Sequence, residues 1–199
     1  MRWLTFAVAA YLVLALQTGL RTLWVLPVVG GVTPDLLLIL LVFVALWAPG
    51  MKVAWGALIL GLLADLHPLP VLHSMQDAAI LGPGVIGFLL GAYVVLQLRT
   101  MVFRDSLLTL CILTFIAGLF VQLMIVALIT VRGVHLPVVS GFLADAPVPG
   151  WSPSLELLRR FLGLIYSALV AAPLGWLLLR FRNLWAFDAQ RGMAAPHAR

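Results

Sequence analysis

Long uncharged apolar stretches recur along this chain and constrain its fold more than any other feature. A helix rises 1.5 Å per residue, so about 20 apolar residues cross a hydrocarbon core about 30 Å thick. Four stretches are about that long, and two are shorter. The six predicted spans are Trp3 to Leu20, Leu36 to Met51, Val53 to Ala64, Ala78 to Leu98, Ser106 to Val131 and Phe161 to Leu179. We therefore predict an all-α, polytopic integral membrane protein, a compact bundle of about six transmembrane helices.

The composition agrees with a location in lipid. Of the 199 residues, 64% are hydrophobic and 10% are charged, and the mean hydropathy is +1.16. These values lie outside the range of soluble domains. The two shorter stretches flank Lys52 and the breaker Ala48-Pro49-Gly50, which predicts a short helical hairpin. A cleavable signal peptide is the rival interpretation of the first stretch, but this stretch is longer than usual and lacks a clear cleavage site, so we expect a retained anchor.

The basic residues predict the orientation in the membrane. With both termini in the cytoplasm, eight of the 12 Lys and Arg residues lie inside, which satisfies the positive-inside rule. The prediction is a transmembrane domain over residues 1–181, with an external Pro-rich loop over 132–154, and a short basic cytoplasmic tail over 182–199. The arginines are spread singly at helix ends and do not gather on one face, so the net charge of +5 does not indicate nucleic-acid binding.

Small residues at helical spacing predict where helices pack. Lipid gives helices little hydrophobic reason to associate, so close approach depends on small side chains stacked on one face. One such ladder repeats every four residues in the last span, and a GxxxG step lies in the fourth. Packing inside one monomer and a groove for a partner protein are both compatible with these patterns. The residues are Gly61, Gly87, Gly91, Gly163, Ser167, Ala171 and Gly175.

Two aspartates lie at the ends of predicted helices. Thr33 is predicted as an N-cap and Pro34 as the first helical residue, which puts the Asp35 carboxylate in the first turn, where the helix dipole favours negative charge. The alternative role for Asp35 is contact with a partner or a neighbouring helix, because carboxylates within membranes are usually paired. Asp65 closes a predicted helix at its C-terminal end, where the dipole has the wrong sign. It therefore needs a partner.

The segment after Asp65 suggests a metal site or a hydrolase, and the sequence favours neither. Imidazole and carboxylate groups suit zinc, but the spacing matches no metal-binding helix motif and two prolines interrupt any regular face. Ser74 lies near His73 but is not part of a nucleophile elbow. We expect no metal, cofactor or catalytic residue. The candidate ligands considered are Asp65, His67, His73 and Asp77.

Three motifs stand in order between about residues 30 and 95. They are Thr33-Pro34-Asp35-Leu-Leu-Leu, then Gly56-x4-Gly61-Leu-Leu-Ala-Asp65-Leu, then Leu81-Gly82 with Gly87-Phe-Leu-Leu-Gly91-Ala-Tyr. Together they resemble the rod shape-determining protein MreD family. Length, number of spans and cytoplasmic termini agree with that family, whereas the external loop from Arg132 to Ser154 is long for it.

This resemblance implies a non-catalytic, multi-pass protein of the bacterial inner membrane that helps to organise peptidoglycan synthesis and cell shape. The implied partners are the scaffold MreC and, through it, the MreB filament, the glycosyltransferase RodA and a penicillin-binding transpeptidase. Within this picture we hypothesise that Asp35 fixes its helix hairpin against neighbouring helices or receives the membrane-proximal segment of MreC.

The main alternative is a substrate-binding subunit of an energy-coupling-factor vitamin transporter, which also has about six short helices. Its first helix usually carries an Ala-x-x-x-Ala coupling motif. A vitamin binder also needs several polar or aromatic pocket groups, and the one dense polar set here lies between Asp65 and Asp77. The coupling motif is absent, because the residues four after Ala7, Ala9, Ala10 and Ala15 are Tyr11, Val13, Leu14 and Gly19.

Overall fold

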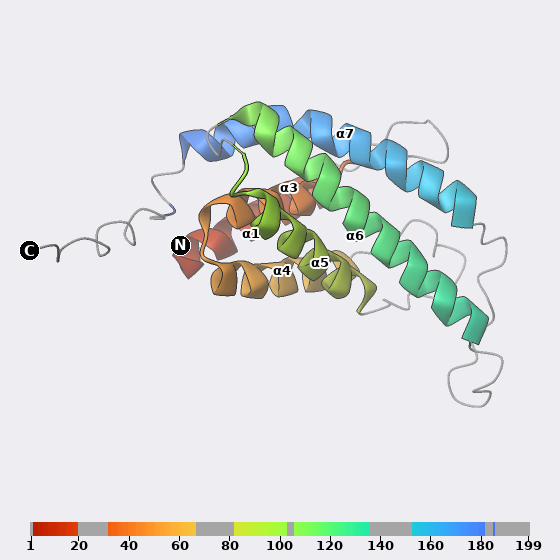
Figure 1. Cartoon of the computed structure of the whole chain (residues 1–199). Helices are drawn as coiled ribbons and strands as arrows, with labels where there is room; N and C mark the ends of the chain where they lie inside the picture. Colours follow the sequence, from red (N-terminus) through yellow and green to blue (C-terminus); the bar gives the residue numbers. More distant parts are fainter. Residues whose placement is uncertain are drawn as a thin grey trace, which may run out of the picture.

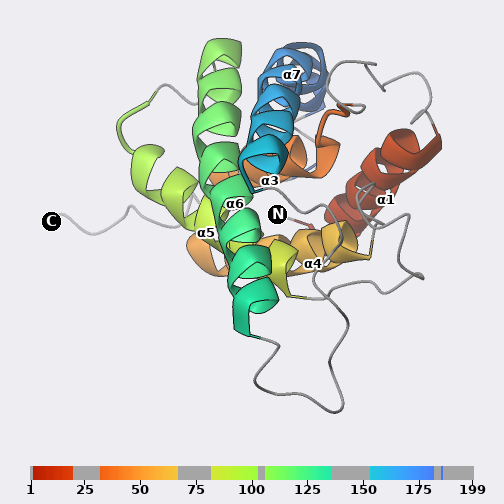
Figure 2. The same cartoon turned by 90° about the vertical axis from the view of Figure 1, so that its right-hand side faces the viewer.

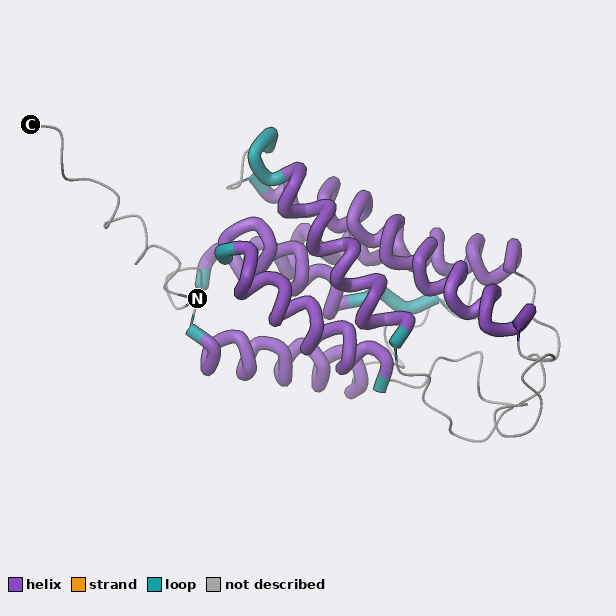
Figure 3. The backbone as a smooth tube through the Cα atoms, turned by 60° about the horizontal axis from the view of Figure 1, so that its bottom comes forward, coloured by secondary structure: helices purple, strands orange, loops and turns teal. Residues whose placement is uncertain are grey.

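A computed structural model describes residues 2–19, 32–66, 82–102, 106–135, 153–181 and 185. These residues form six helices and no strand (Figures 1 and 3), so the predicted all-α class is confirmed for this part of the chain. In chain order the helices are α1 (Trp3–Gly19), α3 (Leu36–Trp47), α4 (Gly50–Asp65), α5 (Pro83–Leu98), α6 (Leu107–His135) and α7 (Pro153–Arg180).

Two of these helices are long and apolar enough to cross a membrane. The candidate spans are Leu107–Val131 in α6 and Leu157–Arg180 in α7, which lie side by side (Figure 1). The helices α1, α3 and α5 are apolar but shorter. With 12 residues, α3 extends about 18 Å, well short of a hydrocarbon core about 30 Å thick.

The two long helices extend beyond the predicted membrane spans. α6 continues past the predicted span end at Val131 to His135, and α7 begins at Pro153, before the predicted span start at Phe161. Arg160 therefore lies inside α7, where its side chain has a polar partner on α6. The predicted external loop is correspondingly shorter, and residues 136–152 lie outside the described residues.

The central helix of the bundle is α3 (Figure 2). Every residue from Leu36 to Leu46 is at most 1% exposed, so all faces of the helix are covered. Its neighbours are α1, α4, α5, α6 and α7. A helix that is apolar all round is stable where protein or lipid covers every side, and here protein covers it.

Both ends of the described chain lie at the C-terminal end of α3. The Arg2 amide donates a hydrogen bond to the Trp185 carbonyl oxygen at 3.3 Å. The Trp185 side chain is 2% exposed and packs edge-on against Phe43, with ring centroids 5.3 Å apart. Trp185 belongs to the predicted cytoplasmic tail over 182–199, and the structure buries it against the central helix.

Candidate functional site

The N-cap of α3 is Asp35, so the prediction of Thr33 as the cap and Pro34 as the first helical residue is wrong. Asp35 has extended backbone angles, and its Oδ1 accepts a hydrogen bond from the Leu38 amide at 3.1 Å. Aspartate is a better N-cap than threonine because its short carboxylate reaches the third helical amide. The helix consequently begins at Leu36, after the proline.

The segment before α3 rests on the ladder of small residues in α7. The Asp35 amide donates to Ser167 Oγ at 2.8 Å, and Ser167 Oγ donates to the Gly163 carbonyl oxygen at 2.8 Å. Ser167 is 1% exposed. A Cβ atom on Gly163 would lie 3.4 Å from the Thr33 carbonyl oxygen, so alanine would just fit there, whereas a side chain larger than alanine would push the segment away.

Charged and polar groups from α6 and α7 complete this contact. Arg160 lies two turns before Ser167 on the same face of α7. Its guanidinium donates to Gln122 Oε1 of α6 at 2.7 Å and attracts the Asp35 carboxylate. The positive end of the α3 dipole favours the same carboxylate. We name this group of residues, which joins α3, α6 and α7, the Asp35 junction: Asp35, Gln122, Arg160, Gly163 and Ser167.

Asp65 binds the N-terminus of α5 from the end of α4. Its Oδ2 accepts hydrogen bonds from the amides of Gly82 at 2.8 Å and Val85 at 3.3 Å, and its Oδ1 accepts from the Gly84 amide at 2.7 Å. The first amides of a helix have no partner within it, and the dipole there favours a negative charge. The start of α5 is therefore the partner that the position of Asp65 requires.

Three glycines make this contact possible. Gly82 has a φ of +125°, which L side chains rarely adopt. A Cβ atom on Gly84 would overlap Asp65 Oδ1, and one on Gly61 would lie 2.6 Å from the Val85 Cα atom. We name this group the Asp65 cap: Gly61, Asp65, Gly82, Gly84 and Val85.

Arg99 holds the other end of α3, a role that the sequence prediction missed. One guanidinium nitrogen donates to the carbonyl oxygens of Ala45 at 3.1 Å and Ala48 at 2.6 Å. The last carbonyls of a helix lack partners within it and favour a cation. The central helix is thus bound at its N-terminal end through Asp35 and at its C-terminal end by Arg99.

The remaining small residues lie where two helices meet. Gly87 and Gly91 of α5 face Val121 of α6, and a Cβ atom on Gly87 would lie 3.1 Å from the Val121 carbonyl oxygen. Ala171 is fully buried, and Gly175 faces the start of α6. In the structure, these residues pack helices of one chain against each other. A second contact with a partner protein stays a prediction.

His67, His73 and Asp77, which the sequence analysis considered as metal ligands and did not favour, lie outside the described residues. Within the ranges that the structure describes, no group of three or more His, Cys, Asp or Glu side chains is placed to hold a metal ion. The Asp65 carboxylate accepts three main-chain hydrogen bonds.

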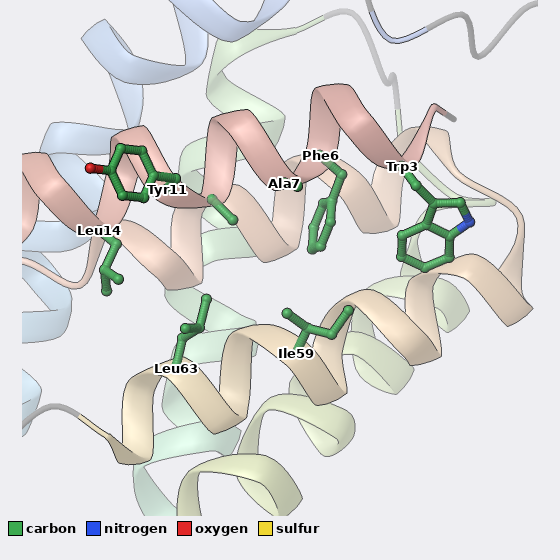
Figure 4. A pocket seen from close by; sticks show the side chains of 8 residues that line it. Trp3, Phe6, Ala7, Tyr11, Leu14, Ile59 and Leu63 are labelled. Atoms are coloured by element: carbon green, nitrogen blue, oxygen red, sulfur yellow. The ribbon is translucent and has the colours of Figure 1, made fainter.

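An apolar groove lies between α1 and α4 (Figure 4). Its volume is about 350 Å³. Phe6 and Leu14 enter it from α1, and Ile59 and Leu63 enter it from α4. We name this the α1–α4 groove, and its lining residues are Trp3, Phe6, Ala7, Ala10, Tyr11, Leu14, Ile59 and Leu63.

These features define the described part of the chain as all-helical, with two helices that could span a membrane and two aspartates that bind helix ends. Comparison with known protein families, with characterised proteins and with solved structures finds no match.

Proposed function

We propose that this chain is a non-catalytic, multi-pass protein of the bacterial inner membrane that helps to organise peptidoglycan synthesis during cell elongation, as its MreD-like motifs imply. It binds MreC and, through MreC, acts with MreB, RodA and a penicillin-binding transpeptidase. Its six helices cross the bilayer, and both termini lie in the cytoplasm.

The observation that carries this proposal is how the polar side chains of the bundle are used. The side chains of Asp35, Asp65, Arg99 and Ser167 each bond to main-chain groups at a helix end or a helix junction. A catalytic group must instead be within reach of a substrate atom. In the part of the chain that the structure describes, these four polar side chains bind the chain's own helices, and this supports a protein that acts by offering helix surfaces to other proteins.

The outer surface of the bundle supports a location in lipid. Large apolar side chains project from several helices, including Tyr11 of α1 at 70% exposure, Leu108 of α6 at 70% and Leu169 of α7 at 68%. Soluble monomers rarely expose extensive apolar surface, whereas lipid tails solvate it. Because α3 extends only about 18 Å, this crossing also needs non-helical backbone, which is tolerated at membrane depth where protein covers it, as protein covers α3 on every side.

The helix directions support six crossings and cytoplasmic termini. Contacts at Asp65 and Gly84 make α4 and α5 antiparallel, and contacts along α5, α6 and α7 continue the alternation. An even number of crossings returns the chain to its starting side. Arg2 and Trp185 meet at that end, and the basic residues there favour the cytoplasm.

The vitamin-transporter alternative requires a pocket with several polar groups. The α1–α4 groove is lined by apolar side chains and one tyrosine. Such a surface gives a polar vitamin few hydrogen-bond partners, whereas the polar set that follows Asp65 in the sequence lies outside the described residues.

Affinity purification from bacterial membranes tests the proposal. We expect the tagged chain to recover MreC together with RodA, whereas an unrelated tagged multi-pass protein recovers neither. Recovery of an ATPase pair and a coupling subunit would instead identify a vitamin transporter. Recovery of neither set under conditions that preserve other membrane complexes would overturn the elongation proposal.

The hypothesis that Asp35 contacts MreC is tested separately with Asp35→Asn, which keeps an N-cap oxygen but removes the charge. If a charged contact with MreC matters, this variant recovers less MreC than the parent chain while it stays folded and membrane-inserted. Unchanged recovery would leave Asp35 with its role in the Asp35 junction only.

A further inference from the structure

The α1–α4 groove lies along the facing sides of α1 and α4. The two helices run in the same direction along it, with Trp3 and Ile59 toward one end and Leu14 and Leu63 toward the other (Figure 4). Side chains beside the groove are exposed, including Leu4 at 78% and Val8 at 51%. Within the proposed membrane location, the groove therefore faces the lipid tails.

Two cationic residues lie on the helix starts next to the Trp3 end of this groove, outside its lining. Arg2 directly precedes Trp3 and is exposed. Lys52 is half-buried and lies two turns before Ile59 on the same face of α4. Gly56 lies one turn after Lys52 and faces Phe6 of α1. A Cβ atom on Gly56 would lie 3.6 Å from the Phe6 ring. The start of α1 and the start of α4 thus bring positive charge to one end of an apolar surface.

The size of the groove and the cations near it favour a lipid over a protein helix as its ligand. A transmembrane helix with its side chains is about 10–12 Å across and needs a broad surface. A groove of about 350 Å³ between two helices suits a thinner occupant. Phospholipids with anionic head groups carry a linear apolar chain and a negative charge, and cations next to a membrane attract such head groups. The exposed Trp3 suits the boundary between head group and chain.

We propose that the α1–α4 groove binds one acyl chain of an anionic phospholipid, whose phosphate group is held by Arg2 and Lys52. This proposal rests on the membrane location within the proposed function and does not depend on MreC. Its failure and the failure of the elongation proposal are therefore distinguishable.

Native mass spectrometry of the full chain in detergent tests this site. Phosphatidylglycerol and phosphatidylcholine with identical acyl chains are titrated separately, and bound lipid is counted. We expect roughly tenfold tighter binding of phosphatidylglycerol, as one or two nearby cations would give. The double variant Arg2→Gln with Lys52→Gln should lose this preference. The matched control is Arg180→Gln, which removes an exposed cation at the same end of the bundle and should keep it.

A second pair of variants tests the groove itself. Ala7 is exposed and lines the groove, so Ala7→Trp should fill it and abolish binding of both lipids. Ala54 is exposed on α4 away from the lining, so Ala54→Trp should bind as the parent chain does. Equal binding of the two lipids by the parent chain would overturn the proposal, as would a preference that survives in the double glutamine variant. If Ala7→Trp binds lipid as the parent chain does but no longer recovers MreC or no longer self-associates, the groove is a protein-binding surface instead.

Discussion

Asp35 and Asp65 both place a carboxylate at a helix N-terminus, but they do so across different distances along the chain. Asp35 caps the helix that it opens, through an amide three residues later. Asp65 ends α4 and caps α5, and its first donor lies 17 residues further on. A local cap determines where one helix begins. A distant cap also fixes two helices relative to each other, so its loss should release tertiary structure as well as a helix end.

The largest effect is expected for Asp65→Ala. It removes the acceptor of three amides at once, and we expect a loss of about 3 kcal/mol in the free energy of unfolding, since hydrogen bonds to charged groups are the stronger ones. Asp65→Asn keeps one carbonyl oxygen and should lose about half as much. Unfolding in mixed micelles with a rising fraction of dodecyl sulfate measures both. A loss in Asp65→Ala no greater than in Asp35→Ala would remove the difference between the two sites.

A smaller loss of stability, which tests the Asp65 contact specifically, is expected for Gly84→Ala. The added methyl group overlaps Asp65 Oδ1 and displaces the carboxylate, with an expected loss of about 2 kcal/mol from strain and lost hydrogen bonds. Gly50→Ala is the matched control at the other end of the same hairpin, where the nearest atom lies 3.9 Å from the new Cβ. The same unfolding assay should show the control as stable as the parent chain. If the two variants lose the same free energy of unfolding, the loss in Gly84→Ala does not come from the contact with Asp65.

The smallest effect is expected for Asp35→Ala. Loss of an N-cap costs about 1 kcal/mol, and Ser167 still accepts the hydrogen bond from the amide of residue 35. Asp35→Asn should stay close to the parent chain because asparagine is an equally good N-cap. Asp35→Asn keeps the cap oxygen and removes only the charge. If it loses as much stability as Asp35→Ala, the attraction of the Asp35 carboxylate to Arg160 contributes more than the N-cap hydrogen bond does.

The sequence predicted the helices well because their apolar runs end at recognisable breaks. The Ala48-Pro49-Gly50 break lies where α3 ends and α4 begins. Small residues at fixed spacing also predicted helix contacts, because close packing requires a particular residue size at a particular period. Both signals are local, so a single stretch of sequence contains them.

The sequence could not identify the partners of charged residues across the chain. Nothing near Asp65 indicates that Gly82 and Gly84 bring the amides of α5 to its carboxylate. Arg99 was predicted as an orientation charge because a cation at a helix end looks the same whether it faces phospholipid or the carbonyls of α3. The sequence also could not predict the full burial of α3, because an apolar helix in lipid and one inside protein have similar sequences.

The enclosure of α3 has a consequence for biosynthesis in the proposed membrane setting. The helix leaves the ribosome early, yet two of its covering neighbours, α6 and α7, are made much later. Ser167 of α7, which accepts the hydrogen bond from the Asp35 amide, is made 132 residues after Asp35. Until then, α3, a short helix with a carboxylate at one end, lies in the bilayer or the insertion machinery without its contacts to α6 and α7. Chains truncated before α7 should therefore be recognised by membrane quality-control proteases, while the complete chain escapes them.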